Sequence, residues 1–212
     1  LQQTDRALSA PLGPGARSPE RAARPGQPTA RPASLTDITA RRIAAHDLGF
    51  LRRLYASTRA EELAATRWPL EAQQQFLAQQ FELQHRHYQV HFADAEFLLL
   101  LRQEQPIGRL YWHAEAGQAT LVEISLLPAH RGHGLGSGLL AVLAAQADLE
   151  GQSIDLHVDP TSPARRLYER FGFIPVAPGG DRLQMMRRPR THEPAAGRPW
   201  LLADLRCDLH AR

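Results

Sequence analysis

The chain has 212 residues, 43% of them hydrophobic, which suffices for one well-filled domain but not for a second of ordinary size. All 25 basic residues are arginine, so the sequence excludes a Walker-type phosphate loop, a pyridoxal Schiff base and other lysine chemistry. The single cysteine, Cys207, excludes an internal disulfide and a thiolate metal cluster, and no apolar run approaches the about 20 residues of a membrane helix. We therefore expect a soluble, cytoplasmic protein with no membrane partner.

The two ends of the chain carry its positive charge. Residues 1–34 are rich in proline, glycine, alanine and arginine without an apolar period, which predicts disorder. This segment and residues 187–212 each carry +3, and since the total is +3, the middle carries −3. We therefore predict a domain over residues 35–188 with no nucleic-acid surface. Residues 189–212 form a C-terminal tail, in which PWLLADL either packs as a short amphipathic turn or is unstructured.

Apolar periods and turn residues predict the elements of the middle segment in order. From Leu35 the pattern alternates like a strand, and Asp47 is placed to cap a helix with apolar residues at helical spacing. A second helix begins at Pro69. Then follow strands over residues 96–102, 107–114 and 120–127, a helix from Leu139 to near Gly151, a strand over 153–158, a helix from Pro163 closed by Gly172, and two short strands. This order predicts an α/β (α+β) fold in which helices flank a mixed sheet.

Four alternating glycines separate the strand predicted over residues 120–127 from the next helix: Gly132, Gly134, Gly136 and Gly138. The dinucleotide fingerprint G-x-G-x-x-G would need glycine at position 137 or 139, where the chain has Ser137 and Leu139. The Rossmann interpretation therefore fails. A turn made of backbone amides before a helix N-terminus suits a pyrophosphate, and a tight turn without a ligand is the alternative.

At this turn the sequence resembles the GNAT family of acyl-CoA-dependent N-acyltransferases. Arg131, Gly134 and Gly136 match the R-x-x-G-x-G pattern of the family, and ISLLP before them resembles its fourth strand. The later family pattern N-x-x-A-x-x-L-Y-x-x-x-G-F is matched by Thr161, Ala164, Leu167, Tyr168, Gly172 and Phe173, with threonine in place of the usual asparagine. The resemblance covers about residues 38–186.

The resemblance implies a mostly antiparallel central sheet of about seven strands, splayed between strands four and five, and acetyl-CoA as cosubstrate without a metal. It places the pyrophosphate on amides of the glycine turn and the pantetheine against the fourth strand. The implied cofactor-binding residues are Ile124, Ser125, Leu126, Arg131, Gly132, His133, Gly134, Leu135, Gly136, Ser137, Thr161, Ala164 and Tyr168.

The resemblance also implies roles for catalytic residues. The Leu126 N–H would stabilise the oxyanion at the thioester carbonyl, and Tyr168 would protonate the departing thiolate. A base is needed because an alkylamine has a pKa near 10 and arrives as ammonium. His157, Glu123 or a water chain remain candidates for that base.

These implications predict an N-acetyltransferase that transfers acetyl to a primary amine, small molecule or peptide, by direct attack in a ternary complex. Helices one and two would line the acceptor site, with side chains near Leu54, Tyr55, Trp68, Phe81 and Trp112, and the negative middle segment favours a cationic acceptor. His85, His87 and His91 lack a carboxylate or cysteine to complete a metal site. A possible homodimer is left open, as are two alternatives: a CoA-binding module without catalysis, and a nucleic-acid- or partner-binding protein acting through its arginine-rich tails.

Overall fold

The computed structural model describes residues 33–179, 182–190 and 201–205. The helices are α1 (Leu48–Ala64), α2 (Leu70–His91), α3 (Leu135–Glu150) and α4 (Ala164–Arg170). The strands are β1 (Ile38–Arg42), β2 (Glu96–Arg102), β3 (Gln105–Glu115), β4 (Gln118–Leu126), β5 (Ser153–Val158), β6 (Ile174–Gly179) and β7 (Arg182–Arg187). Short 3-10 turns are η1 (Ala33–Leu35), η2 (Ala45–Asp47), η3 (Pro128–His130) and η4 (Leu202–Leu205). The predicted order of helices and strands is confirmed.

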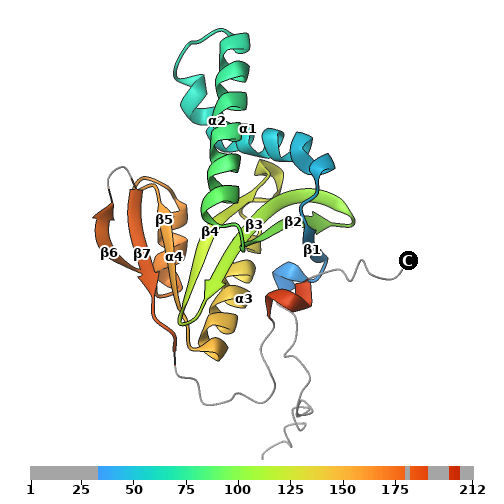
Figure 1. Cartoon of the computed structure of the whole chain (residues 1–212). Helices are drawn as coiled ribbons and strands as arrows, with labels where there is room; N and C mark the ends of the chain where they lie inside the picture. Colours follow the sequence, from blue (N-terminus) through green and yellow to red (C-terminus); the bar gives the residue numbers. More distant parts are fainter. Residues whose placement is uncertain (1–32, 180–181, 191–200, 206–212) are drawn as a thin grey trace, which may run out of the picture.

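The strands form one seven-stranded sheet in the order β1-β2-β3-β4-β5-β7-β6. Short turns join β2 to β3 and β3 to β4, so these strands pair antiparallel, whereas α3 connects β4 to β5, which pair parallel. Helices α1 and α2 lie on one face of this sheet and α3 and α4 on the other (Figure 1). The predicted mixed, mostly antiparallel sheet is therefore confirmed.

A bulge in β4 separates it from β5. Opposite β3, Trp112 pairs with Leu121 and Tyr111 pairs with Glu123, so Val122 is an extra residue. A bulge bends its strand and increases the local twist. The parallel pairing of β4 with β5 ends at Leu121, although β4 runs on to Leu126 and β5 to Val158. This divergence confirms the predicted splay between strands four and five.

The two faces of the sheet bury different cores. The larger core lies under α3 and α4 and includes Leu110, Trp112 and Leu139, all 2% exposed or less. The smaller core lies under α1 and α2 and includes Leu54 and Phe81. Because successive residues of a strand point to opposite faces, β3 sends Leu110 and Trp112 to the larger core and Arg109 and Tyr111 to the other face.

The C-terminal segment LLADL packs against the domain. Leu202 and Leu205 of η4 are each 1% exposed and join the larger core, and the Leu202 N–H donates to Gln146 Oε1 at 3.2 Å. For residues 201–205 the packed turn, one of the two predicted alternatives, is therefore correct. The predicted disorder of residues 1–32, and the rest of the C-terminal tail from 191 onward, lie outside the described residues.

Two local predictions were wrong. Helix α3 begins at Leu135 rather than Leu139, because the helix packs so closely on η1 that a Cβ at Gly138 would lie 2.9 Å from Leu35 Cγ. Asp47 does not cap α1 with its side chain. Its carboxylate instead accepts two bonds of 2.7 Å from the Arg41 guanidinium and one of 2.8 Å from the Ala44 N–H.

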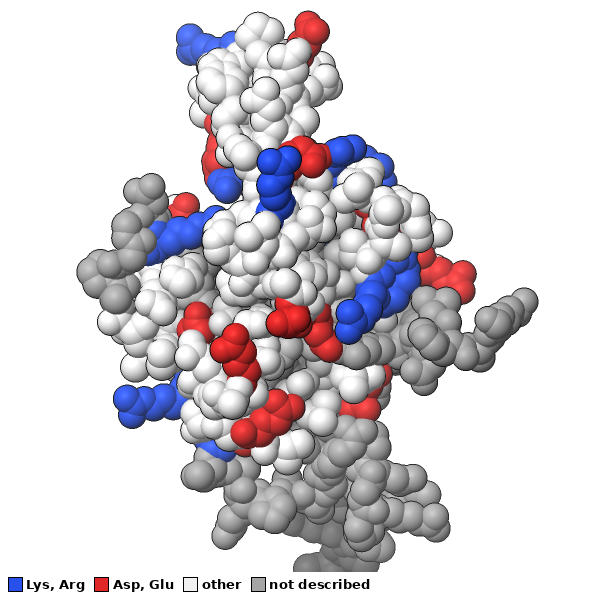
Figure 2. Space-filling view, viewed as in Figure 1, with Lys and Arg blue, Asp and Glu red and all other residues white. Residues whose placement is uncertain are grey.

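Charge is distributed in small groups over the surface. Figure 2 shows basic and acidic side chains scattered over the face that carries α2, with uncharged surface between them. Within the described ranges, no helix combines the length and the apolar content that crossing a membrane requires.

Candidate active site

The glycine turn before α3 presents unused backbone amides. Gly132 and Gly134 both have φ of 78°, the left-handed region that favours glycine. The Gly138 N–H donates to the Gly134 carbonyl, and since this is the first bond of the helix, the amides of residues 135–137 have no partner within it. Among the described residues, no side chain caps this end. These amides, together with the positive end of the helix dipole, form a site for an anion.

Arg131 has a different part in this turn from the predicted one. Its amide is already used, because it donates to the Pro128 carbonyl at 3.1 Å. Its side chain reaches back, with Nε donating to the Leu126 carbonyl at 2.8 Å and Nη2 lying 3.5 Å from Ser57 Oγ. Arg131 therefore ties the turn to the end of β4 and to α1, and the amides left for an anion start at Gly132.

The end of β4 directs backbone groups into the gap beside β5. The Leu127 N–H donates to the Ile107 carbonyl of β3 at 2.9 Å. Backbone groups alternate in direction along a strand, so the N–H and C=O of Leu126 point away from β3, and those of Ile124 do the same. Between them, Ser125 faces Arg109 of β3, and the Ser125 hydroxyl accepts a hydrogen bond from Arg109 Nε at 3.2 Å. The predicted thioester donor, the Leu126 N–H, thus faces the opening between the splayed strands.

Tyr168 lies on α4 on the other side of this gap. It is 7% exposed, and its ring packs on Phe173 with centroids 5.8 Å apart. Burial, and to a lesser extent the negative charge of Glu123, raises the pKa of Tyr168 to about 12. The phenol is therefore protonated at neutral pH, as a general acid must be.

Two other predicted residues lie beside α4. Ala164 begins the helix, and its N–H donates to Ser162 Oγ at 3.2 Å, so the Ser162 hydroxyl satisfies one amide of the first turn of α4. The Thr161 amide and hydroxyl both donate to Asp159 Oδ1, at 2.7 and 2.6 Å. The backbone and side-chain donors of Thr161 are therefore both used within the loop that precedes α4.

Glu123 belongs to a buried polar cluster beneath α2. Its Oε2 accepts from the Tyr88 hydroxyl at 3.1 Å and lies 3.4 Å from Arg109 Nη2, which also donates to Gln84 Oε1 at 2.9 Å. Burial, followed by the charge of Glu123, raises the pKa of Tyr88. Burial, the largest single influence, acts to lower the pKa of Arg109, but Glu123, Tyr111 and Tyr88 together outweigh it and the net shift is upward. The sequence prediction missed Arg109 and Tyr88, although an arginine inside the apolar run IGRLYW was a usable signal.

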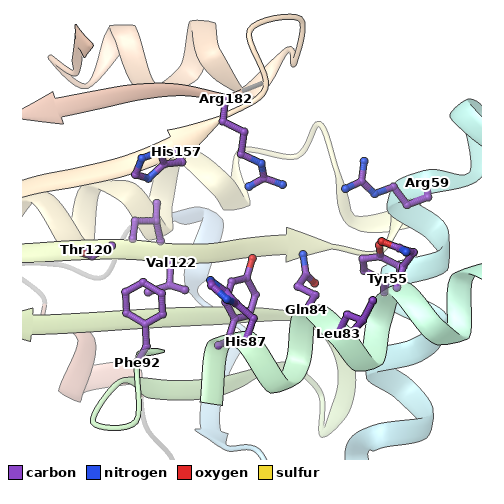
Figure 3. A pocket seen from close by; sticks show the side chains of 13 residues that line it. Tyr55, Arg59, Leu83, Gln84, His87, Phe92, Thr120, Val122, His157 and Arg182 are labelled. Atoms are coloured by element: carbon purple, nitrogen blue, oxygen red, sulfur yellow. The ribbon is translucent and has the colours of Figure 1, made fainter. Parts of the chain in front are cut away.

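A pocket of about 560 Å³ lies between α1, α2 and the strands β4, β5 and β7 (Figure 3). His157 projects into it from β5, opposite Gln184 of β7. The pocket is lined by Tyr55, Arg59, Gln80, Leu83, Gln84, His87, Tyr88, Phe92, Thr120, Leu121, Val122, His157 and Arg182. The two candidate bases are therefore on the α2 side of the sheet, His157 in the pocket wall and Glu123 behind Tyr88.

Of the five residues predicted near the acceptor, only Tyr55 lines this pocket. Leu54 and Phe81 are buried in the core under α1 and α2, and Trp112 is buried on the opposite face because it alternates with Tyr111. Trp68, half exposed between α1 and α2, packs edge-on against Phe76 at 5.4 Å.

The three histidines of α2 make ring contacts and do not converge on one point. His87 and His91 stack with ring centroids 4.1 Å apart, while His85 stacks on Phe81. Among the described residues, no group of three or more His, Cys, Asp or Glu side chains is arranged to hold a metal ion.

Comparison with known proteins points to one family. Residues 93–175 match the model of the acetyltransferase (GNAT) domain. The [ribosomal protein bS18]-alanine N-acetyltransferase of Haemophilus influenzae is 38% identical over 80 residues, which are 37% of this chain and 55% of that protein. The chain thus spans about half the length of this relative.

Solved structures share the fold. The PaiA N-acetyltransferase of Thermoplasma acidophilum, solved with coenzyme A, superposes with a TM-score of 0.55 at 19% identity, covering 71% of this chain and 98% of that one. An acetyltransferase of Thermus thermophilus gives a TM-score of 0.53 at 24% identity, covering 73% and 98%. Residues 93–175 thus match an acetyltransferase (GNAT) domain, and the described part of the chain shares its fold with solved acetyltransferases.

Proposed function

We propose that the chain is an acetyl-CoA-dependent N-acetyltransferase that acts on a primary amine by direct attack in a ternary complex. The proposal rests on the divergence of β4 from β5 and on three features of the elements beside it. These are the free amides of residues 135–137, the Leu126 N–H, and the protonated phenol of Tyr168. Each supplies one part of what acyl transfer from a thioester requires.

The residues present fit the cosubstrate. The amides from Gly132 to Ser137 would hold the pyrophosphate, since no side chain caps this turn and Gly132 and Gly134 have no Cβ to obstruct it. The backbone of Ile124 and Leu126 faces the gap and would pair with the pantetheine amides. When bound, acetyl-CoA supplies an acetyl group activated as a thioester.

The chain's own residues would then manage charge and protons. The Leu126 N–H donates to the carbonyl oxygen that gains negative charge as the amine nitrogen bonds to the carbonyl carbon. As the carbon–sulfur bond breaks, Tyr168 gives its proton to sulfur. We assign the base to His157, because it lines the pocket, whereas Glu123 already accepts from Tyr88 and lies beside Arg109.

The acceptor is a primary amine, and a peptide α-amine comes first among the candidates. The pocket volume of about 560 Å³ accommodates a few residues of an extended peptide. The Haemophilus relative, which is named for acetylation of an alanine of ribosomal protein bS18, supports this choice for the matching segment.

Two measurements test the proposal. Calorimetry of the full chain with coenzyme A should detect binding at one site. Acetyl-CoA should then release free thiol in the presence of some members of a panel of small amines and short peptides, with the acetylated amine confirmed by mass. Coenzyme A binding without thiol release for any amine would favour the non-catalytic module, and no coenzyme A binding would overturn the proposal.

A further inference from the structure

The outer end of the pocket is formed by two arginines from distant parts of the chain. Arg59 comes from α1 and Arg182 begins β7, and Figure 3 shows their guanidinium groups directed toward the same space. His87 and His157 add two imidazole rings, and among the described residues that line the pocket none is Asp or Glu. The wall therefore offers hydrogen-bond donors and positive charge to whatever enters beside the amine site.

The carboxylates around the pocket are already engaged. Glu123 accepts from Tyr88 and lies beside Arg109, which is 1% exposed and thus a fixed buried counter-charge. Asp155 Oδ1 accepts bonds of 2.7 and 2.9 Å from the side chains of Gln118 and Thr120. These two acids therefore bind neighbouring donors and do not neutralise Arg59 or Arg182.

Two acids lie close to the arginines themselves. Asp159 accepts both donors of Thr161, and the charges of Arg182 and Arg59 help to lower its pKa. Glu62 pairs with Arg59 Nη1 at 2.9 Å. Glu62 is 62% exposed, so water screens its charge. Within the described part of the chain, Arg182 forms no ion pair.

The strand register gives the spacing between the amine and this pair. His157 faces Gln184, and Arg182 lies two residues before Gln184 on the same strand. At a rise of about 3.3 Å per residue, Arg182 is displaced about 7 Å from His157 along the strand. A carboxylate within two peptide residues of an amine beside His157 would therefore reach the strand position of Arg182, and Arg59 faces the same space.

We propose that the acceptor is an acidic amine: a primary amine bearing a carboxylate about 7 Å from its nitrogen, which Arg59 and Arg182 bind together. This inference rests on the proposed acetyltransferase function and narrows its acceptor class. It reverses the expectation of a cationic acceptor, because the charge that an acceptor meets is that of the pocket wall and not the −3 of the middle segment. Peptides with glutamate at the second position and ω-amino acids both satisfy it.

Matched acceptors test the proposal with the full chain. The comparison sets ε-aminocaproate against hexylamine, and peptides beginning Ala-Glu against otherwise identical peptides beginning Ala-Gln and Ala-Lys. The proposal predicts kcat/KM about tenfold higher for the acidic member of each set, with the preference reduced by added salt. Preference in the peptide set alone identifies a peptide acceptor, and preference in the ε-aminocaproate set alone identifies a small molecule. Equal rates, or faster turnover of Ala-Lys, would overturn it.

Variants test whether the preference for acidic acceptors comes from Arg59 and Arg182. Arg182→Gln and Arg59→Gln should each reduce the acidic preference about tenfold. Arg53→Gln is the matched control, because Arg53 is on the same helix as Arg59 but bonds to the Gly49 carbonyl and lies over Phe50, outside the pocket. An acidic preference that persists in both pocket variants would also contradict the proposal.

A binding measurement separates this inference from the proposed function. Calorimetry of the coenzyme A complex with ε-aminocaproate and with hexylamine reports acceptor selection even if neither amine is acetylated. Tighter binding of ε-aminocaproate that depends on Arg182 would support the inference while turnover fails. Equal binding would reject it whatever the turnover.

Discussion

The candidate site has two halves on opposite faces of the sheet, one made of backbone groups and the other of side chains. On the α3 face, the anion turn and the donor at Leu126 consist of backbone amides, which the glycines leave uncovered. On the α1 and α2 face, the pocket consists of side chains brought together by the bulge at Val122 and by strand register. The first half is local in sequence and the second is not. A substitution should therefore affect cosubstrate binding on one face, and acceptor selection or stability on the other.

The largest effect is expected where the two halves meet, at Tyr168. Replacing it by phenylalanine keeps the ring on Phe173 but removes the proton donor. We expect kcat to fall about 1000-fold, within the range of general acid catalysis, while coenzyme A affinity and thermal midpoint stay near those of the parent. Because burial raises the pKa of Tyr168 to about 12, its ionisation should not limit activity up to about pH 10. Equal thiol release by both proteins would assign the proton to another group.

The next largest effect concerns stability on the side-chain face. Arg109→Met should lower the free energy of unfolding by about 3 kcal/mol, because it leaves Glu123, whose side chain is only 18% exposed, without its counter-charge. Urea denaturation measures this loss. The double variant with Glu123→Gln should recover part of it, since no unpaired charge remains. If the double variant loses the sum of the two single losses, the pair is not coupled.

Sequence reasoning succeeded best on the backbone face. The R-x-x-G-x-G and Thr161–Phe173 patterns are local, and through the family resemblance they predicted the turn before α3 and the helix α4, both of which form at those residues. The start of α3 was predicted too late because glycine is a poor helix former, and here packing on η1 overrides that propensity.

The side-chain face was predicted poorly for physical reasons. A single extra residue at Val122 determines which side chains of β4 face α2, and the apolar pattern of TLVEISLL does not reveal it. The pocket joins residues from five elements, and Arg182 enters through strand pairing alone. Trp112 was predicted to line the acceptor site, but alternation along β3 buries it on the other face.

A smaller effect should appear at the start of α1, where Asp47 binds Arg41 and the Ala44 amide. Asp47→Asn should lower the free energy of unfolding by about 2 kcal/mol at neutral pH. The hydrogen bond from Arg41 lowers the pKa of Asp47, so this stability is present above the unfolded pKa near 4 and is lost as pH falls through the folded pKa. Urea titrations at a series of acidic pH values should therefore show the two proteins converging. A constant difference would mean that the carboxylate charge is not responsible.

The smallest effect is expected at two glycines, whose comparison distinguishes the conformational cost of a Cβ from its effect on coenzyme A binding. Gly132 in the anion turn has φ of 78° and Gly117 between β3 and β4 has φ of 80°, and a Cβ on either would meet no atom within 4 Å. Alanine at each position should cost the same stability, about 1 kcal/mol, because the strain is the same. Only Gly132→Ala should also weaken coenzyme A, by about tenfold in calorimetry, since its methyl group would point into the space that the diphosphate needs. If both variants bind coenzyme A equally well, the glycine is present for the turn alone, and the backbone half of the site is not where we have placed it.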